Sequence, residues 1–159
     1  MKLQVSSQLA IFAIVELAER PDRQLTVAEI GAKYGASTHH LAKIMHVLGR
    51  AGLVRSIRGA GGGYQFSGNA RRTTLLDVIE LFETLGTGGS GTAEPGTGTT
   101  QGSALQMVLR EIDDAARATL GSITLATLCS LAGRYETGSS TGNAPIQAAV
   151  TQQIGPTAR

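Results

Sequence analysis

Residues 37–66 decide the fold, and they read STHHLAKIMHVLGRAGLVRSIRGAGGGYQF. Ser37 is a residue type that caps helices, and apolar residues then recur at the i, i+3, i+4 and i+7 spacing of one helix face. At about 100° per residue, a second set of side chains projects from the opposite face. The apolar set is Leu41, Ile44, Met45 and Leu48, and the opposite set is His39, Lys43, His46 and Arg50. We therefore predict a helix that ends at Gly52 and has one core face and one cationic face.

A β-hairpin, or wing, is expected directly after this helix. Leu53–Arg58 and Tyr64–Ser67 are short strand-like runs on either side of the glycine-rich residues 59–63. Glycines allow the positive φ that a tight turn needs, and a tip without side chains lets the backbone approach a groove or a phosphate. A nucleotide-binding loop is not expected, because no Gly-Lys-Ser/Thr follows and the glycines do not lead from a strand into a helix.

Two helices are expected before residue 37. The segment Ser6–Arg20 is apolar almost all round and is stopped by Pro21. Thr26 and Glu29 have the spacing of a capping box, and Gly35 offers a left-handed stop for a short second helix. Two short helices joined by a turn with a glycine, the second with an exposed basic face, are typical of a helix-turn-helix that places its second helix in a DNA major groove.

The second half of the chain predicts further helices around a linker. Thr74 and Asp77 can cap a helix whose apolar stripe runs from Leu75 to Phe82. The stripe of Ser103–Leu120 must be buried on the N-terminal bundle or on a second copy, and a dimer suits symmetric DNA sites. We divide the chain into a DNA-binding domain at 1–85, a flexible Gly/Thr-rich loop at 86–102, a dimerisation helix with a short following helix at 103–135, and a disordered tail at 136–159.

Positive charge is concentrated in one part of the chain. Between Glu29 and Asp77 there is no acidic residue, and all three histidines fall there. The basic residues of this stretch are Lys33, Lys43, Arg50, Arg55, Arg58, Arg71 and Arg72. Such clustering favours a nucleic-acid partner, with a solvated basic face as the alternative.

Several other classes of protein are not expected. One cysteine cannot close an internal disulfide or supply a four-thiolate zinc site. Without a signal peptide or a run of about 18 apolar residues, we expect a cytoplasmic protein with no membrane contact. We expect no enzymatic activity, because Glu80 and Glu83 fall on the solvent side of a helix and Asp77 has a capping role.

These residues resemble those of a family of bacterial winged-helix transcription regulators that includes the iron-sulfur cluster regulator IscR and the nitric-oxide-sensitive repressor NsrR. The resemblance extends over residues 1–131 and is most specific in the wing. The matching motifs are Met1-Lys2-Leu3, Glu29-Ile30, Ser37 with Leu41, Ala51-Gly52-Leu53-Val54, Arg58-Gly59, Gly61-Gly62-Gly63-Tyr64, Asp77-Val78-Ile79 and Ile123-Thr124-Leu125. The resemblance implies a dimer whose third helices enter successive major grooves, whose wing arginine reaches the minor groove and whose long C-terminal helix crosses to the partner.

The sequence departs from this family at its cluster site. Sensing members hold an iron-sulfur cluster with three cysteines in the loop before the long helix, whereas residues 86–102 contain none and Ser103 stands where the third is expected. Cys129 lies among leucines, as a small core residue does. We predict no cofactor and no metal, and atypical ligation of a cluster by Cys129, across a dimer or with a histidine, stays open as an alternative.

The prediction is a winged helix-turn-helix protein, mostly α-helical with a small β-hairpin, that binds double-stranded DNA as a homodimeric repressor on a palindromic operator. The expected DNA contacts are Ser37, Thr38, His39, His40, Lys43, Arg50, Arg55, Arg58, Gly59 and Tyr64. Two alternatives stay open. One is a regulator that senses a redox signal or a small effector, and the other is a protein-interaction module whose basic patch is incidental.

Overall fold

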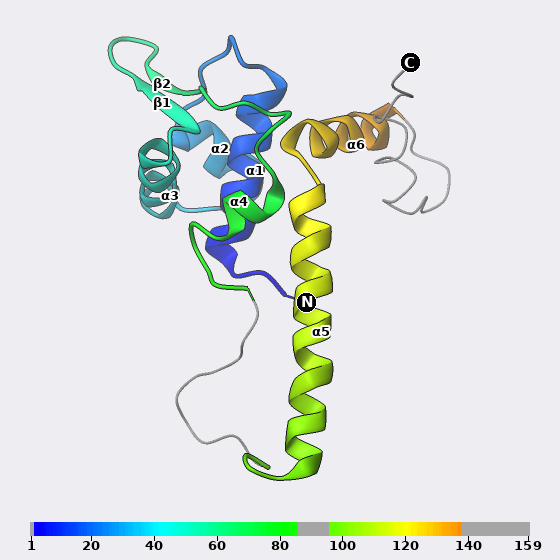
Figure 1. Cartoon of the computed structure of the whole chain (residues 1–159). Coiled ribbons are helices and arrows are strands. Elements are labelled where there is room, and N and C mark those ends of the chain that lie inside the picture. Colours follow the sequence, from blue (N-terminus) through cyan, green and yellow to red (C-terminus); the bar gives the residue numbers. More distant parts are fainter. Residues whose placement is uncertain (1, 86–95, 138–159) are drawn as a thin grey trace, which may run out of the picture.

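The computed structural model describes residues 2–85 and 96–137 (Figure 1). A bundle of short helices carries a two-stranded hairpin on one side, and a long helix extends away from the bundle before the chain turns back to it. In chain order the elements are α1 (Val5–Glu19), α2 (Val27–Tyr34), α3 (Thr38–Arg50), β1 (Val54–Ile57), β2 (Gly63–Phe66), α4 (Leu75–Ile79), α5 (Thr100–Ser122) and α6 (Leu125–Thr137). The predicted fold class, mostly helical with a β-hairpin wing, is confirmed.

Helix α1 is the centre of the bundle. Its Ala13, Ile14 and Leu17 are fully buried, and the helix packs against α3, α4 and α6. Helix α1 contacts neighbours on several sides, so it must bury apolar side chains on more than one face. This explains why its sequence is apolar almost all round. The core is completed by residues from the other helices: Ile30, Leu41, Ile44, Met45, Leu48, Val78, Ile79 and Leu125.

Local signals set the ends of α2 and the start of α3. The Thr26 hydroxyl accepts from the N–H of Glu29 at 3.2 Å, and a Glu29 carboxylate oxygen accepts from the N–H of Thr26 at 2.7 Å. Gly35 ends α2 in the left-handed conformation, with a φ of 63°. The Ser37 hydroxyl then accepts from the N–H of His40 at 3.2 Å and begins α3. The expected capping box, glycine stop and third helix are all present.

The wing is an antiparallel pair with Val54 opposite Phe66 and Ile57 opposite Gly63. A third segment joins it, because Leu25 forms an antiparallel bridge with Tyr64. The turn between α1 and α2 is therefore fastened to β2 by backbone hydrogen bonds, so the hairpin has a fixed position on the bundle.

Two predicted boundaries were wrong. Helix α4 ends at Ile79 rather than near Phe82, because the chain tightens into i→i+3 bonds, with Phe82 N–H donating to the Ile79 carbonyl at 2.9 Å. Helix α5 begins at Thr100, inside the predicted loop 86–102, because the Thr99 hydroxyl accepts from the N–H of Gly102 and caps the first turn. Residues 86–95 of that loop, and 138–159 of the predicted tail, lie outside the described residues.

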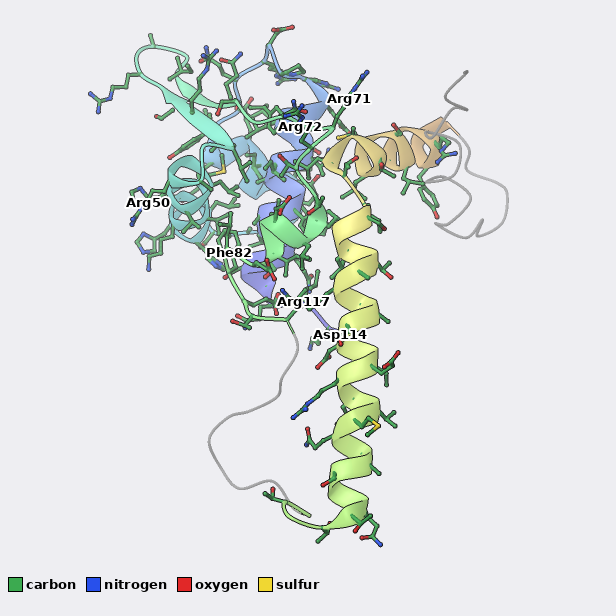
Figure 2. The ribbon with its side chains drawn as sticks, in the orientation of Figure 1. Arg50, Arg71, Arg72, Phe82, Asp114 and Arg117 are labelled. Carbon is green, nitrogen blue, oxygen red and sulfur yellow. The ribbon has the colours of Figure 1, made fainter. Side chains whose placement is uncertain are left out.

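The last turns of helix α5 attach it to the bundle. The Arg117 guanidinium pairs with Glu80 and donates to the Leu85 carbonyl at 3.0 Å (Figure 2). Further from the bundle, the predicted stripe is open to solvent in the single chain, with Leu105 57% exposed and Ile112 58% exposed.

Candidate nucleic-acid interface

Helix α3 has the two faces that its sequence predicts. Leu41, Ile44, Met45 and Leu48 are buried in the core. The four residues of the opposite face, His39, Lys43, His46 and Arg50, are all exposed. In Figure 2, Arg50 extends away from the bundle on the side where α3 and the wing both lie. The helix thus offers a row of cationic and hydrogen-bonding side chains to solvent while its other side is fixed by packing.

One predicted contact residue points elsewhere. The His40 ring Nε2 lies 3.1 Å from the Ser6 hydroxyl of α1, and His40 is partly buried. This contact ties the first turn of α3 to the central helix. In this arrangement His40 positions α3, whereas the neighbouring Thr38 and His39 are exposed.

The tip of the wing is shaped by glycine. Gly59 and Gly61 have φ angles of 112° and 78°, which residues with a Cβ rarely adopt. A Cβ on Gly62 would lie 2.5 Å from the Ile57 carbonyl oxygen, so this position also needs glycine. Arg58 is exposed at the entrance of the tip. The predicted glycine turn is confirmed, and it leaves the guanidinium of Arg58 beside a backbone with no side chains.

The base of the wing holds two further predicted residues in place. The Arg55 guanidinium donates to Gln65 Oε1 from Nη2 at 2.9 Å and from Nε at 3.2 Å, and Gln65 Nε2 donates to the Pro21 carbonyl at 2.7 Å. Tyr64 is partly buried and packs against the core. The structure therefore places Arg55 at the exposed base of the wing and Tyr64 at its inner side.

Two arginines that were not among the predicted contacts lie beyond the wing. Arg71 and Arg72 are both exposed, in the turn that follows Asn69 (Figure 2). They lie toward α6 rather than beside Arg50 on α3. The basic residues of this stretch thus lie in separate places. Lys43, Arg50, Arg55 and Arg58 belong to α3 and the wing, Arg71 and Arg72 to this turn, and Lys33 to α2, where it pairs with Glu16.

Residues 3–131 match the Rrf2 family, which is described as iron-dependent transcriptional regulators. The chain is also 44% identical over 128 residues to BadM of Rhodopseudomonas palustris, an HTH-type transcriptional regulator, and the match covers 80% of this chain and 81% of BadM. The chain belongs to the Rrf2 family. As an Rrf2 protein it is a DNA-binding transcription regulator, and its relatives are regulators rather than enzymes.

Solved structures of Rrf2 proteins share the architecture. The chain is similar to CymR, the global cysteine regulator of B. subtilis, with a TM-score of 0.67, 27% identity, and coverage of 82% of this chain and 98% of CymR. It is also similar to IscR of T. potens, with a TM-score of 0.61, 26% identity, and coverage of 89% and 94%. These similarities confirm the predicted family and the winged-helix fold.

The family description names iron, but the metal-ligating side chains of this Rrf2 chain do not fit a family-type iron-sulfur cluster. The chain has a single cysteine, Cys129, so one copy cannot supply the three thiolates of a family-type cluster. Cys129 lies half-buried in α6, where burial and the charge of Glu19 raise the pKa of its thiol. Within residues 2–85 and 96–137, no three His, Cys, Asp or Glu side chains come together in a way that could hold a metal ion.

Among the helices of residues 2–85 and 96–137, none combines the length and the apolar character that a membrane span requires.

Proposed function

We propose that this chain is a repressor that acts in the cytoplasm as a homodimer on a palindromic operator. One observation carries the proposal: His39, Lys43, His46 and Arg50 on one face of α3 are all exposed, while the stripe on its opposite face is buried, namely Leu41, Ile44, Met45 and Leu48. A helix that is packed on one side and exposed to solvent on the other can lie in a DNA major groove, which is about 12 Å wide, with its side chains against base edges.

The proposed dimer rests on the open face of α5. Leu105, Val108, Leu109 and Ile112 share one side of this helix and are all exposed in the single chain. A row of large apolar side chains exposed to water is unfavourable and is typical of an interface between proteins. Because two copies related by a two-fold axis can bury the same stripe against each other, α5 supplies the symmetry that a palindromic operator requires.

The proposed DNA surface combines α3 with the wing. Thr38, His39, Lys43 and Arg50 would face the major groove, and Arg58 with Gly59 would face the adjacent minor groove. Ser37 begins the helix whose N-terminal residues approach the DNA, while Arg55 would contact a phosphate from the base of the wing. In this proposal His40 and Tyr64 position the DNA surface and do not contact DNA, because His40 bonds to Ser6 of α1 and Tyr64 packs against the core.

The proposal is tested by titrating the purified protein on the DNA upstream of its own gene, with footprinting on the same fragment. We expect two protected half-sites with centres about 34 Å apart, and a linear fall of log K with log salt. Adding the protein to an in vitro transcription reaction from that promoter should reduce the transcript. Binding to heparin and random DNA alone, with no preferred site, would favour the interaction-module alternative.

A further inference from the structure

Gln65 of β2 connects the base of the wing to the end of the central helix. Its side-chain Nε2 donates to the Pro21 carbonyl at 2.7 Å. Its Oε1 accepts two hydrogen bonds from the Arg55 guanidinium, from Nη2 at 2.9 Å and from Nε at 3.2 Å. Pro21 follows directly after the cap of α1, and its ring restricts the backbone at that point. The exposed guanidinium of Arg55 is therefore tied, through one amide, to the centre of the bundle.

The partners of Gln65 fix the orientation of its amide. A backbone carbonyl can only accept and a guanidinium can only donate, so Nε2 must face Pro21 and Oε1 must face Arg55. Gln65 and Arg55 also stand directly opposite each other in β2 and β1, so both side chains leave the hairpin on the same face. The bonds to Gln65 use one edge of the guanidinium, formed by Nε and Nη2. The other edge, formed by Nη1 and the second hydrogen of Nη2, makes no hydrogen bond to the described residues.

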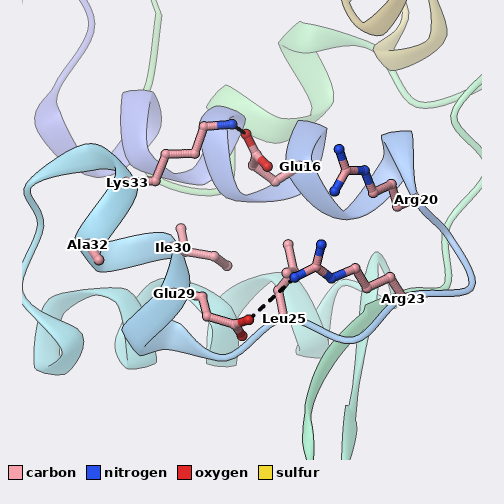
Figure 3. Close-up of a pocket in the computed structure, with 8 residues that line it drawn as sticks. All are labelled: Glu16, Arg20, Arg23, Leu25, Glu29, Ile30, Ala32 and Lys33. Carbon is pink, nitrogen blue, oxygen red and sulfur yellow. Dashed lines mark hydrogen bonds and ion pairs between the residues drawn. The ribbon is translucent and has the colours of Figure 1, made fainter.

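The partner that holds Arg55 is uncharged, and in this Arg55 differs from other basic residues of the chain. Lys33 pairs with Glu16, and Arg23 pairs with Glu29 (Figure 3). Each of these cations lies beside a carboxylate that offsets its charge. In the described part of the chain, no carboxylate pairs with Arg55. Its guanidinium is therefore oriented and still keeps its full positive charge, as an arginine that binds an anion requires.

The position of Arg55 on the wing indicates which anion it meets. Three residues of extended chain, about 10 Å, separate Arg55 in β1 from Arg58 at the tip. When Arg58 enters the minor groove, a side chain this far behind the tip comes to the edge of the groove, where the phosphates lie. Arginine and phosphate form two parallel hydrogen bonds, and the free edge of the guanidinium has this geometry. A backbone phosphate thus matches both the charge and the donors that Arg55 presents.

We propose that Gln65 is a positioning residue of the DNA surface, which holds Arg55 in the orientation that binds a backbone phosphate. A long side chain loses rotamer freedom when it binds, and this loss is smaller when the side chain is already ordered. Because the amide is neutral, Gln65 orders Arg55 without offsetting its charge. This inference rests on the proposed function, in which Arg55 contacts a phosphate.

The test is a double-mutant cycle in the full chain, with wild type, Gln65→Met, Arg55→Gln and the double variant titrated on the upstream DNA at several salt concentrations. Methionine keeps the length of the side chain but has no amide. When Arg55 is present, we expect Gln65→Met to weaken binding about three- to tenfold, because one long side chain must then be ordered on binding. In the Arg55→Gln background, Gln65→Met should change the affinity by less than about twofold. Arg55→Gln itself should reduce the slope of log K against log salt by about one, while Gln65→Met should keep the wild-type slope.

Ser67→Ala is the matched control for the anchoring of the wing. The Ser67 hydroxyl donates to the Gly52 carbonyl at 3.1 Å, so this variant also removes a side-chain bond at the base of the wing but leaves Arg55 untouched. We expect its DNA affinity to equal that of the wild type. Equal losses from Gln65→Met with and without Arg55 would overturn the proposal, because Gln65 would then act on the wing or on DNA directly. An unchanged affinity of Gln65→Met, or an unchanged salt slope of Arg55→Gln, would overturn it as well.

The hydrogen bond itself is tested without DNA, by the exchange of the Arg55 Nε–H proton with water in NMR spectra of the free protein. Gln65→Met should speed this exchange severalfold, and Ser67→Ala should not change it. Equal exchange in wild type and Gln65→Met would contradict the proposed role of Gln65. Failure of the wild type to bind any DNA would contradict the proposed function, whereas DNA binding without coupling between positions 55 and 65 would contradict this inference alone.

Discussion

Leu25 and Tyr64 exchange two backbone hydrogen bonds, from Leu25 N–H to the Tyr64 carbonyl at 2.9 Å and from Tyr64 N–H to the Leu25 carbonyl at 2.8 Å. This bridge joins the turn between α1 and α2 to the inner strand of the wing. A two-stranded hairpin alone is only marginally stable in water, so this third segment gives the wing a defined orientation. The wing and the central helix therefore act as one unit.

The bridge predicts a strict requirement for glycine at position 63. A Cβ on Gly63 would lie 2.7 Å from the Leu25 carbonyl oxygen, which is backbone and cannot rotate away. We expect Gly63→Ala to lower the free energy of unfolding by about 1 to 3 kcal/mol, as measured by urea titration. The control is Gly49→Ala in α3, where the nearest atom is 3.8 Å away and alanine should stabilise by about 0.5 to 1 kcal/mol. Unchanged stability of Gly63→Ala would contradict this role of the bridge.

Features within one element could be predicted from the sequence. The capping box at Thr26 and Glu29, the stop at Gly35 and the two faces of α3 follow from residue type and spacing over one or two turns. The start of α5 was missed although Thr99 is a capping residue type, because the glycines around it were interpreted as part of one continuous loop.

Contacts between elements could not be predicted in the same way. His40 meets Ser6, and Arg55 reaches the turn 20–25 through Gln65. Each depends on how α1 crosses the helix-turn-helix, and neither spacing nor propensity encodes that crossing. The sequence predicted the cationic face of α3, but the contacts of His40 and Arg55 required the packed structure.

Glu16 should make the stability of the protein depend on pH in the acidic range. The pKa of this carboxyl is below its ordinary value of 4.5: burial by itself raises it, but the bonds from Lys33 and Tyr34 lower it. A carboxylate with a lowered folded-state pKa stabilises the fold above its unfolded pKa, and this contribution is lost as the pH falls through the folded pKa. At pH 7 we expect Glu16→Gln to lower the free energy of unfolding by about 0.5 to 1 kcal/mol.

The measurement is urea unfolding of wild type and Glu16→Gln at several pH values. The difference between the two proteins should shrink as the pH falls below 4.5. Glu111→Gln, at an exposed position of α5, serves as the control and should change stability little at any pH. A difference at Glu16 that stays constant in acid would show that packing, not charge, sets its contribution.

The exposed stripe of α5 predicts how dimerisation can be broken. Ile112→Asn places a polar side chain where we propose that two copies bury the same residue. Because the dimer is two-fold, the buried apolar contact is lost in both copies. We expect a shift toward monomer in sedimentation and a fall in operator affinity of about tenfold or more. Asp114→Asn, on the opposite side of the helix, should leave both unchanged. A dimer that survives Ile112→Asn with full operator affinity would place the interface elsewhere.

Lys43 tests the orientation of α3 on DNA. If its ammonium contacts a base edge, Lys43→Ala should cost about 1 to 3 kcal/mol of binding free energy and relax the preference at one position in each half-site. Titrations on an operator and its single-base variants measure both effects. Lys2→Ala removes an exposed charge from the N-terminus and serves as the control. Equal weakening on every sequence would indicate a phosphate contact, and no weakening would contradict the proposed orientation.

Arg58 tests the wing, and its expected effect differs from that of Lys43. Its exposed guanidinium lies beside the glycine tip, where the backbone can approach a narrow groove. Narrow A·T-rich minor grooves have the most negative potential, and adenine N3 and thymine O2 accept hydrogen bonds there. We therefore expect Arg58→Ala to weaken binding most on operators with A·T-rich flanks and to erase their advantage over G·C-rich flanks.

The measurement is a set of titrations of wild type and Arg58→Ala on paired operators that differ only in the flanks, at one salt concentration. Equal losses on both flank types would reduce Arg58 to a phosphate contact, and no loss on either would remove the wing from DNA recognition.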